Sequence, residues 1–310
     1  MEERVKDLLQ GAIDLHVHCD PSFMYRKGDA ISFSDEAIDA GMRAVCFKDH
    51  HLPTVQAAWL ANAHHKENSL PYDAFGSVVL NHSEGDFNLY VLDMYLRYGA
   101  KQVYMPTISD RTPMRPLPGM QKNQNPGAFL PVKVIPPKEK PLHVLDVRGE
   151  VKPEVLECMA LVRDYDAILS TGHLDYEECY KVVKAAIGIG VKKILLTHFN
   201  APEIVYDASD NKRSLAVMNE IASLSPNIMV ELTHTLTVNG AVSKEEQMET
   251  IRFYGPERIC LGTDCGSRNY PGLVECWKQM LTQLLEAGFT EEEIRRMTRE
   301  NQRVLLELND

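Results

Sequence analysis

Short apolar runs alternate with longer amphipathic stretches along the chain, and this alternation predicts the fold. The apolar runs lack regular polar alternation, which is typical of strands that are buried on both faces. They span Ala12–Val17, Ala44–Phe47, Ser77–Leu80, Gln102–Met105, Ala167–Ser170, Lys193–Leu196, Ile228–Leu232 and Ile259–Leu261. The clearer helical patterns between them span Thr54–Glu67, Asp86–Tyr98, Lys152–Tyr165, Asp175–Ile187 and Ser214–Leu224. Two pairs with capping-box spacing, Ser243 with Glu246 and Thr290 with Glu293, predict further helix starts.

Strands that alternate with helices indicate a parallel α/β fold, for which two architectures compete. In a doubly wound open sheet, polar site residues gather near one crossover point, whereas in a barrel they recur after many strands. Here polar residues follow most of the eight predicted strands. We therefore predict a (β/α)8 TIM-like barrel that forms a single domain over residues 1–310.

The segment Thr107–Pro141 breaks the alternation after the fourth predicted strand. It holds eight of the seventeen prolines, an excess of Arg and Lys, and almost no helical or strand pattern. Because it follows a barrel strand, we expect the insertion, residues 107–151, to lie over the barrel mouth; an oligomer-forming excursion is the alternative. Leu142–Val147 and Gly149–Val151 are candidates for a small hairpin at its end.

Most of the eleven histidines follow a predicted strand directly or lie within a few residues of its end. These are His16, His18, His50, His51, His82, His173, His198 and His234. His16 and His18 form an H-x-H pair, and residues i and i+2 of a strand point the same way, so both imidazoles can converge on one ion. Asp264 similarly follows the last strand. Since imidazole and carboxylate groups are common metal ligands, this placement predicts a metal site at the strand ends.

The order of these residues resembles the amidohydrolase superfamily, which shows H-x-H after strand one, histidines after strands five and six, and an aspartate after strand eight. The resemblance spans Asp14–Leu308. It implies one or two divalent ions, zinc or manganese first, bound by His16, His18, His173, His198 and Asp264. His50 and His82 are further ligand candidates. In detail, Gly41–His50 and Thr171–Leu174 resemble an uncharacterised branch of that superfamily, so no substrate follows.

One departure from the superfamily pattern concerns the bridge between two ions. Many two-metal members place a carboxylated lysine or a glutamate after strand four, but here that strand ends in Tyr104–Thr107. Lys48, at the end of strand two, is the obvious substitute. It could be carboxylated and bridging, grip an anionic substrate as a plain cation, or form a structural ion pair. One-metal and two-metal sites both stay open.

The predicted function is hydrolysis of a small, anionic or cyclic substrate: a cyclic amide, a lactone or a C–C bond of a cyclic diketone. Asp264 would be the general base toward a metal-activated water, while His198 and His234 could stabilise the oxyanion or hold the ions. Guanidinium groups bind carboxylates in bidentate fashion. The candidates for this role are Arg111, Arg115, Arg148 and Arg268.

Three other functions compete with hydrolysis. The same type of site supports a metal-dependent decarboxylase. Asp14–His18 followed by Phe47–His51 also resembles a phosphoesterase of the polymerase-and-histidinol-phosphatase type, in which Asp49 and His50 would be ligands. Outside enzymes, the alternative is a non-catalytic metal-binding protein, which a nearly complete ligand set with a base at Asp264 argues against.

Composition and charge disfavour some classes of binding partner. A net charge of -11 repels phosphate backbones and anionic lipid, which disfavours nucleic acid and membrane partners. The chain starts without the charged and apolar segments of a signal peptide, and no apolar run is long enough to span a bilayer. Seven scattered cysteines without a C-x-x-C pair are typical of reduced thiols. We therefore expect a cytoplasmic protein that takes a small-molecule substrate, with a homo-oligomer left open.

Overall fold

The strands form one eight-stranded parallel sheet in the order in which they occur in the chain. The computed structural model describes residues 1–66, 71–110 and 141–308. The strands are β1 (Ile13–His18), β2 (Ala44–Lys48), β3 (Asp73–Val79), β4 (Ala100–Tyr104), β5 (Ile168–Ser170), β6 (Ile194–Leu196), β7 (Ile228–Thr233) and β8 (Ile259–Gly262). The ring closes just past the end of β8, where the amide of His18 donates to the carbonyl of Cys265 at 2.8 Å. The fold is a (β/α)8 barrel, as predicted.

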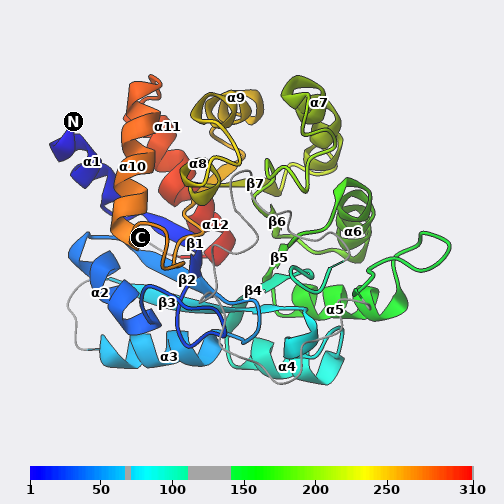
Figure 1. Ribbon diagram of the computed structural model, residues 1–310. Helices are drawn as coiled ribbons and strands as arrows, with labels where there is room; N and C mark the ends of the chain where they lie inside the picture. The colour runs from blue at the N-terminus through cyan, green and yellow to red at the C-terminus, as the bar shows by residue number, and fades with distance from the viewer. Residues whose placement is uncertain (67–70, 111–140, 309–310) are drawn as a thin grey trace.

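The helices that connect successive strands lie outside the ring of strands (Figure 1). They are α2 (Ala30–Asp39), α3 (Val55–His64), α4 (Leu89–Arg97), α5 (Pro153–Asp164), α6 (Tyr176–Ile189), α7 (Asn211–Ala222) and α9 (Lys244–Tyr254). Shorter turns follow two strands, η1 (His82–Glu84) after β3 and α8 (Thr235–Val238) after β7. Helix α1 (Glu2–Leu9) precedes β1, and the chain ends with α10 (Leu273–Glu286), α11 (Glu291–Arg295), the π-helical turn η2 (Arg296–Glu300) and α12 (Asn301–Leu306).

The last helix closes the end of the barrel at which the strands begin. Leu305 and Leu306 of α12 pack in one apolar cluster with Ile13 and Leu15 of β1 and with side chains of β2, β5, β6 and β8. The side-chain amide of Gln302 donates to the carbonyl of Leu261, which ties this helix to β8. Apolar packing therefore fills one end of the barrel, and the polar groups of its interior gather at the other end, where the strands finish.

The sequence patterns predicted most of this architecture. All eight predicted strands are present, and the largest change is at β3, which begins at Asp73 rather than Ser77; Asp73 and Phe75 are only partly buried, so the first residues do not form a continuous buried run. The five predicted helices are α3 to α7, and both capping boxes form. The proposed hairpin is reduced to a single antiparallel bridge between Leu145 and Val151. Helices α1, α2 and α10 were not predicted.

Residues 111–140 of the insertion lie outside the described residues, and its position over the barrel mouth stays a prediction. Its described start is firmly anchored: Thr107 is fully buried, and its amide donates to the side chain of Asn81 at 2.9 Å. The insertion therefore leaves the barrel at the carboxyl end of β4.

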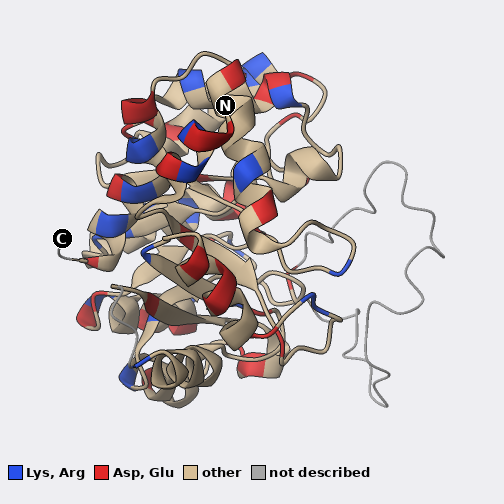
Figure 2. Ribbon diagram, turned by 90° about the vertical axis from the view of Figure 1, so that its left-hand side faces the viewer, with Lys and Arg blue, Asp and Glu red and all other residues tan. Residues whose placement is uncertain are grey.

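Acidic and basic residues are interspersed along the outer helices of the described chain (Figure 2). No helix within residues 1–66, 71–110 and 141–308 is long and apolar enough to cross a membrane.

Candidate metal centre at the carboxyl ends of the strands

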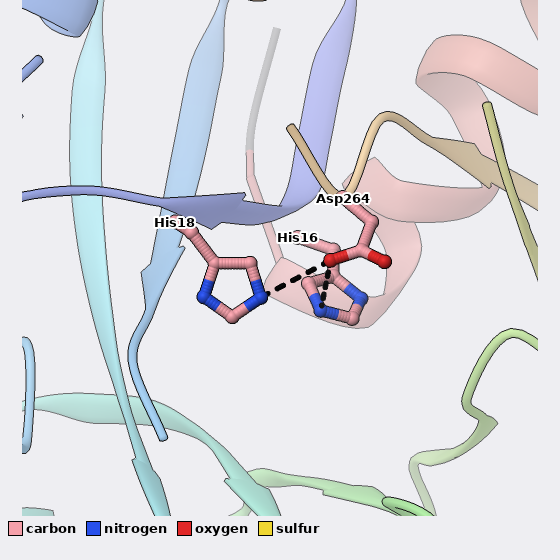
Figure 3. A group of neighbouring side chains, drawn as sticks. All are labelled: His16, His18 and Asp264. Carbon is pink, nitrogen blue, oxygen red and sulfur yellow. Dashed lines mark ion pairs between the residues drawn. The ribbon is translucent and has the colours of Figure 1, made fainter. Parts of the chain in front are cut away.

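His16 and His18 of β1 converge on Asp264, which follows β8 (Figure 3). The Nε2 atoms of the two imidazoles lie 3.2 and 3.1 Å from the same oxygen, Asp264 Oδ1. The three ligand atoms lie within 4.8 Å of one another. Both imidazoles are buried, whereas the Asp264 side chain keeps 22% of its surface exposed. The cluster is thus open on the Asp264 side.

The local backbone explains how these side chains meet. The pairing of β1 with β2 shifts register between Asp14 and Val17, and such a bulge re-aims the side chains that follow it. Leu15 can therefore join the apolar interior while His16 and His18 turn toward Asp264. Asp264 itself has a φ of 53°, in the left-handed region that non-glycine residues rarely adopt. Such strain is found most often at functional sites.

A closed circuit of five histidine rings surrounds this point. His50 follows β2, His173 follows β5 and His198 follows β6. Going round the circuit from His16 through His18, His50, His173 and His198 back to His16, successive ring centroids are 5.4, 4.8, 5.8, 4.9 and 5.9 Å apart. Burial lowers the pKa of every one of these imidazoles, to about 3 for His16 and about 4 for His198. The rings are therefore neutral, the form in which histidine binds metals.

Glu231 orients two members of this circuit. Its Oε2 lies 3.1 Å from His16 Nδ1 and accepts the backbone amide of His198 at 3.0 Å. A carboxylate behind Nδ1 holds the ring proton there and leaves the Nε2 lone pair facing Asp264, an arrangement common behind metal-bound histidines. Burial raises the pKa of Glu231 to about 7, although His198 opposes the shift.

Among the residues that the structure describes, Lys48 is the only lysine in the set of largest fully buried side chains, with 1% of its surface exposed. Its Nζ lies 3.0 Å from His16 Nε2 and 4.6 Å from the centre of the Tyr104 ring. Burial lowers the pKa of Lys48 to about 8, although Asp264 opposes the shift. Tyr104 occupies the end of β4, and its hydroxyl donates to the carbonyl of Leu15.

Arg26 brings a second buried positive charge to the cluster. It bonds Asp49 at 2.9 Å, and its Nη2 lies 3.1 Å from His18 Nδ1. A guanidinium group can only donate, so His18 Nδ1 accepts and the ring proton sits on Nε2, facing Asp264. His18 can bind an ion through Nε2 only after that proton moves to Nδ1 and Arg26 gives up the contact.

Four other predicted site residues, among those that the structure describes, have their contacts with residues outside this circuit. His82 Nδ1 pairs with Asp86 at 2.7 Å, and His234 Nε2 contacts Gln279 of α10 at 3.3 Å. Arg148 is exposed in the turn of the small hairpin, and exposed Arg268 stacks on Tyr25, 5.0 Å from the ring centre. Arg111 and Arg115 lie outside the described residues.

Two residues that the sequence patterns did not single out are central here. Glu231 lies inside a predicted apolar strand, and a charged residue at such a position is itself a sign of a buried partner. Arg26 lies in the loop after β1, where a basic residue usually indicates a solvent-facing side chain. Only the folded chain shows that Asp49 and His18 hold Arg26 inside.

The donor set fits a divalent ion. With its proton held by Glu231, His16 presents the Nε2 lone pair beside Asp264 Oδ1 at 3.2 Å, and these two electron-rich atoms together favour a positively charged group. Within the described part of the chain, the buried Nδ1 atoms of His173 and His198 also have no hydrogen-bond partner. Neutral imidazoles and a carboxylate are the ligands that zinc and similar ions prefer.

A second group of metal-ligating side chains lies on the outer surface, at α2 and the end of α3. The ligand atoms of Asp35, His64 and His65 also lie within 4.8 Å of one another. Two of these residues are exposed, so this surface cluster is distinct from the barrel cluster, which is formed by His16, His18 and Asp264.

A family model described as a family of unknown function, DUF6282, matches residues 11–221. The chain belongs to this family. The matched stretch covers β1 to β6 with their histidines and ends before Glu231 and Asp264. No curated protein sequence matches the chain significantly.

Solved structures with the same fold match nearly the whole chain. An amidohydrolase from Pseudomonas aeruginosa is 12% identical, with a TM-score of 0.59 over 98% of this chain and 97% of that one. The probable dipeptidase PvdM from the same organism is 9% identical, with a TM-score of 0.60 and the same coverage. A 2,6-dihydroxybenzoate decarboxylase from Rhizobium is 12% identical, with a TM-score of 0.53 over 97% of this chain and all of that one. These structures share the predicted (β/α)8 barrel fold with this chain.

Proposed function

We propose that this protein is a metal-dependent hydrolase that acts on a small, anionic or cyclic substrate at the carboxyl ends of its barrel strands. The observation that carries the proposal is the convergence of His16 and His18 on Asp264, inside a circuit of neutral, buried histidines. In barrels of this type, catalytic residues come from the ends of several strands at this same face.

Each residue of the cluster then has a chemical task. A divalent ion held there would activate a water molecule and polarise a substrate carbonyl group. Asp264 is the candidate base, because it is the member of the cluster that reaches solvent, and Thr235 Oγ1 steadies its other oxygen with a hydrogen bond of 3.1 Å. His173 and His198 offer further ligands or donors to a developing oxyanion.

The buried positive charges favour an anionic substrate. Lys48 and Arg26 both lie at the cluster, and Arg26 is already neutralised by Asp49. Lys48 is therefore the residue that we expect to meet a substrate carboxylate or enolate. Cyclic amides, lactones and cyclic diketones with such a group are the substrate classes to test first.

Metal content is the first test of this proposal. We expect one to two equivalents of zinc or manganese in protein purified without chelator, measured by elemental analysis. The variant His64→Ala serves as the parent, because it removes the surface cluster. In that parent, His16→Ala together with His18→Ala should lose the barrel ion and keep the fold, since rim residues serve function more than stability. Absence of metal, with no uptake on titration, would contradict the proposal.

Activity against a panel of substrates separates the competing functions. The panel holds lactones, cyclic amides, cyclic diketones, aromatic carboxylic acids and phosphomonoesters. Hydrolysis that requires metal, and that falls on the order of 100-fold or more in Asp264→Asn, supports the proposal. Release of carbon dioxide without consumption of water would identify a decarboxylase instead, and release of phosphate would identify a phosphoesterase. An ion-loaded protein that turns over none of these classes would favour a non-catalytic metal-binding role.

A further inference from the structure

The ammonium group of Lys48 stands where His16 would coordinate an ion. Lys48 Nζ lies 3.0 Å from His16 Nε2, and the Nδ1 atom of the same ring is committed to Glu231. Nε2 is therefore the one nitrogen of His16 available to a metal, and its lone pair already accepts from Lys48. The contact does not depend on charge, because both an ammonium and a neutral amine can donate to that lone pair.

The surroundings hold Lys48 in this position. The side chain is buried, and its Nζ also packs over the face of Tyr104, 4.6 Å from the ring centre. An aromatic face attracts a cation, and a desolvated pair of this kind is stronger than an exposed one. The negative charges of Asp264 and Glu231 face the same region. Lys48 thus has the partners that a divalent ion would otherwise have: an imidazole nitrogen and nearby carboxylates.

We propose that Lys48 and a divalent ion compete for His16, so that Lys48 sets the metal affinity of the barrel cluster. An ion that binds His16 Nε2 must first displace the lysine Nζ, since the one lone pair of Nε2 cannot accept a hydrogen bond and bind an ion at the same time. This inference rests on the proposed function, because it assumes that the barrel cluster binds an ion. It differs from a carboxylated Lys48, which would be a ligand and would strengthen metal binding.

The variant Lys48→Met separates the two roles, because methionine keeps much of the length and apolar bulk of lysine but cannot donate a hydrogen bond. Competition predicts that Zn²⁺ binds this variant roughly 10- to 100-fold more tightly than the parent, the factor expected for loss of one hydrogen bond from a charged donor. Lys48→Arg keeps donors at this position and should bind Zn²⁺ no more tightly than the parent. Both variants carry His64→Ala, so that the surface cluster does not contribute.

The readout is Zn²⁺ affinity from competition with a chromophoric chelator, which needs no substrate. Lys193→Met is the matched control, since Lys193 is a partly buried lysine paired with Asp166 and Glu307 away from the cluster. If Lys48→Met does not fold, Lys48→Gln replaces it, and thermal unfolding of each apo-protein establishes which variants are folded.

The outcomes are distinct. Tighter Zn²⁺ binding in Lys48→Met but not in Lys193→Met supports competition. An affinity within twofold of the parent overturns it, and an affinity at least tenfold weaker overturns it in favour of a carboxylated ligand. Failure of the proposed function looks different: the parent and its His16→Ala variant would then bind Zn²⁺ equally weakly.

Discussion

Glu231→Gln should weaken metal binding while leaving the apo-protein as stable as before or more stable. Glu231 is 1% exposed, and its Oε2 accepts from His16 and from the backbone of His198. Glutamine has the same shape and retains one oxygen for these donors, but it lacks the negative charge that keeps the His16 proton on Nδ1. Loss of such a partner behind a metal ligand typically reduces affinity 10- to 100-fold, or about 1.4–2.8 kcal/mol.

Stability should change in the opposite direction, and the pKa of Glu231 gives the magnitude. Burial raises this pKa from 4.5 to about 7 in the folded protein. Between these values the folded state binds more protons than the unfolded state, so stability falls as the pH rises from about 4.5 to about 7. The difference between the two pKa values corresponds to about 3 kcal/mol in the free energy of unfolding. Glutamine cannot ionise, so the variant should lack this part of the pH dependence.

Two measurements on chelator-treated protein test this reasoning. Urea unfolding at pH 5 and at pH 8 gives the free energy of unfolding, and Zn²⁺ titration at pH 8 gives the affinity. We expect the free energy of unfolding of Glu231→Gln, relative to that of the parent, to be larger at pH 8 than at pH 5, so that the variant gains stability at the higher pH. Glu178→Gln is the control, because Glu178 is equally buried in α6 but lies outside the histidine circuit.

Two results would refute the reasoning. Unchanged Zn²⁺ affinity in Glu231→Gln would mean that Glu231 does not position His16. A loss of stability at pH 8 that exceeds the loss at pH 5 would mean that the ionised carboxylate stabilises the fold, contrary to the raised pKa.

Neighbouring contacts support three further predictions. Arg26→Ala leaves the fully buried Asp49 carboxylate without its ion-pair partner and should lower the free energy of unfolding by about 3–5 kcal/mol in urea; a loss below about 1 kcal/mol would contradict this. Gly266 has a φ of +116°, and Gly266→Ala would press a Cβ atom against the carbonyl of His18, so this variant should have a lower Tm and a lower Zn²⁺ affinity. Its control is Gly188→Ala, in open space within α6, which should raise the free energy of unfolding by about 0.5–1 kcal/mol. Chelation should lower the Tm of the parent but not that of the double variant His16→Ala, His18→Ala, and an equal shift in both would place the stabilising ion elsewhere.

The barrel was predictable from sequence because its strands are buried on both faces and therefore appear as apolar runs. Even β5 and β6, which have only three residues each, were found in this way. Helices α1 and α10, which pack against each other, were missed because the alternation of strands and helices indicates only connecting helices. This reason does not apply to α2, which connects β1 to β2.

The direction of a side chain at a strand end was harder to predict than its presence there. Parallel strands bring their carboxyl ends to one face, so His16, His18, His50, His173, His198 and Asp264 could be assigned to it from chain order alone. His82 and His234 satisfied the same rule, yet their rings pair with Asp86 and Gln279. What decides between these outcomes is a partner that lies elsewhere in the chain, and sequence spacing does not identify that partner.

The charged side chains around the histidine circuit nearly neutralise one another, and sequence spacing alone did not bring them together. Arg26 and Asp49 neutralise each other, and the five histidines of the circuit carry no charge. Lys48 then faces two carboxylates, Asp264 and Glu231, which leaves the cluster with a net charge of -1 when both are ionised. A divalent ion would turn this into +1, or into +2 if Glu231 kept its proton. Since a buried excess of positive charge is unfavourable in a region of low dielectric constant, a site loaded with such an ion would favour an anion as its next ligand. The net charge that would favour binding of a metal would therefore also favour the proposed substrates that carry a negative charge.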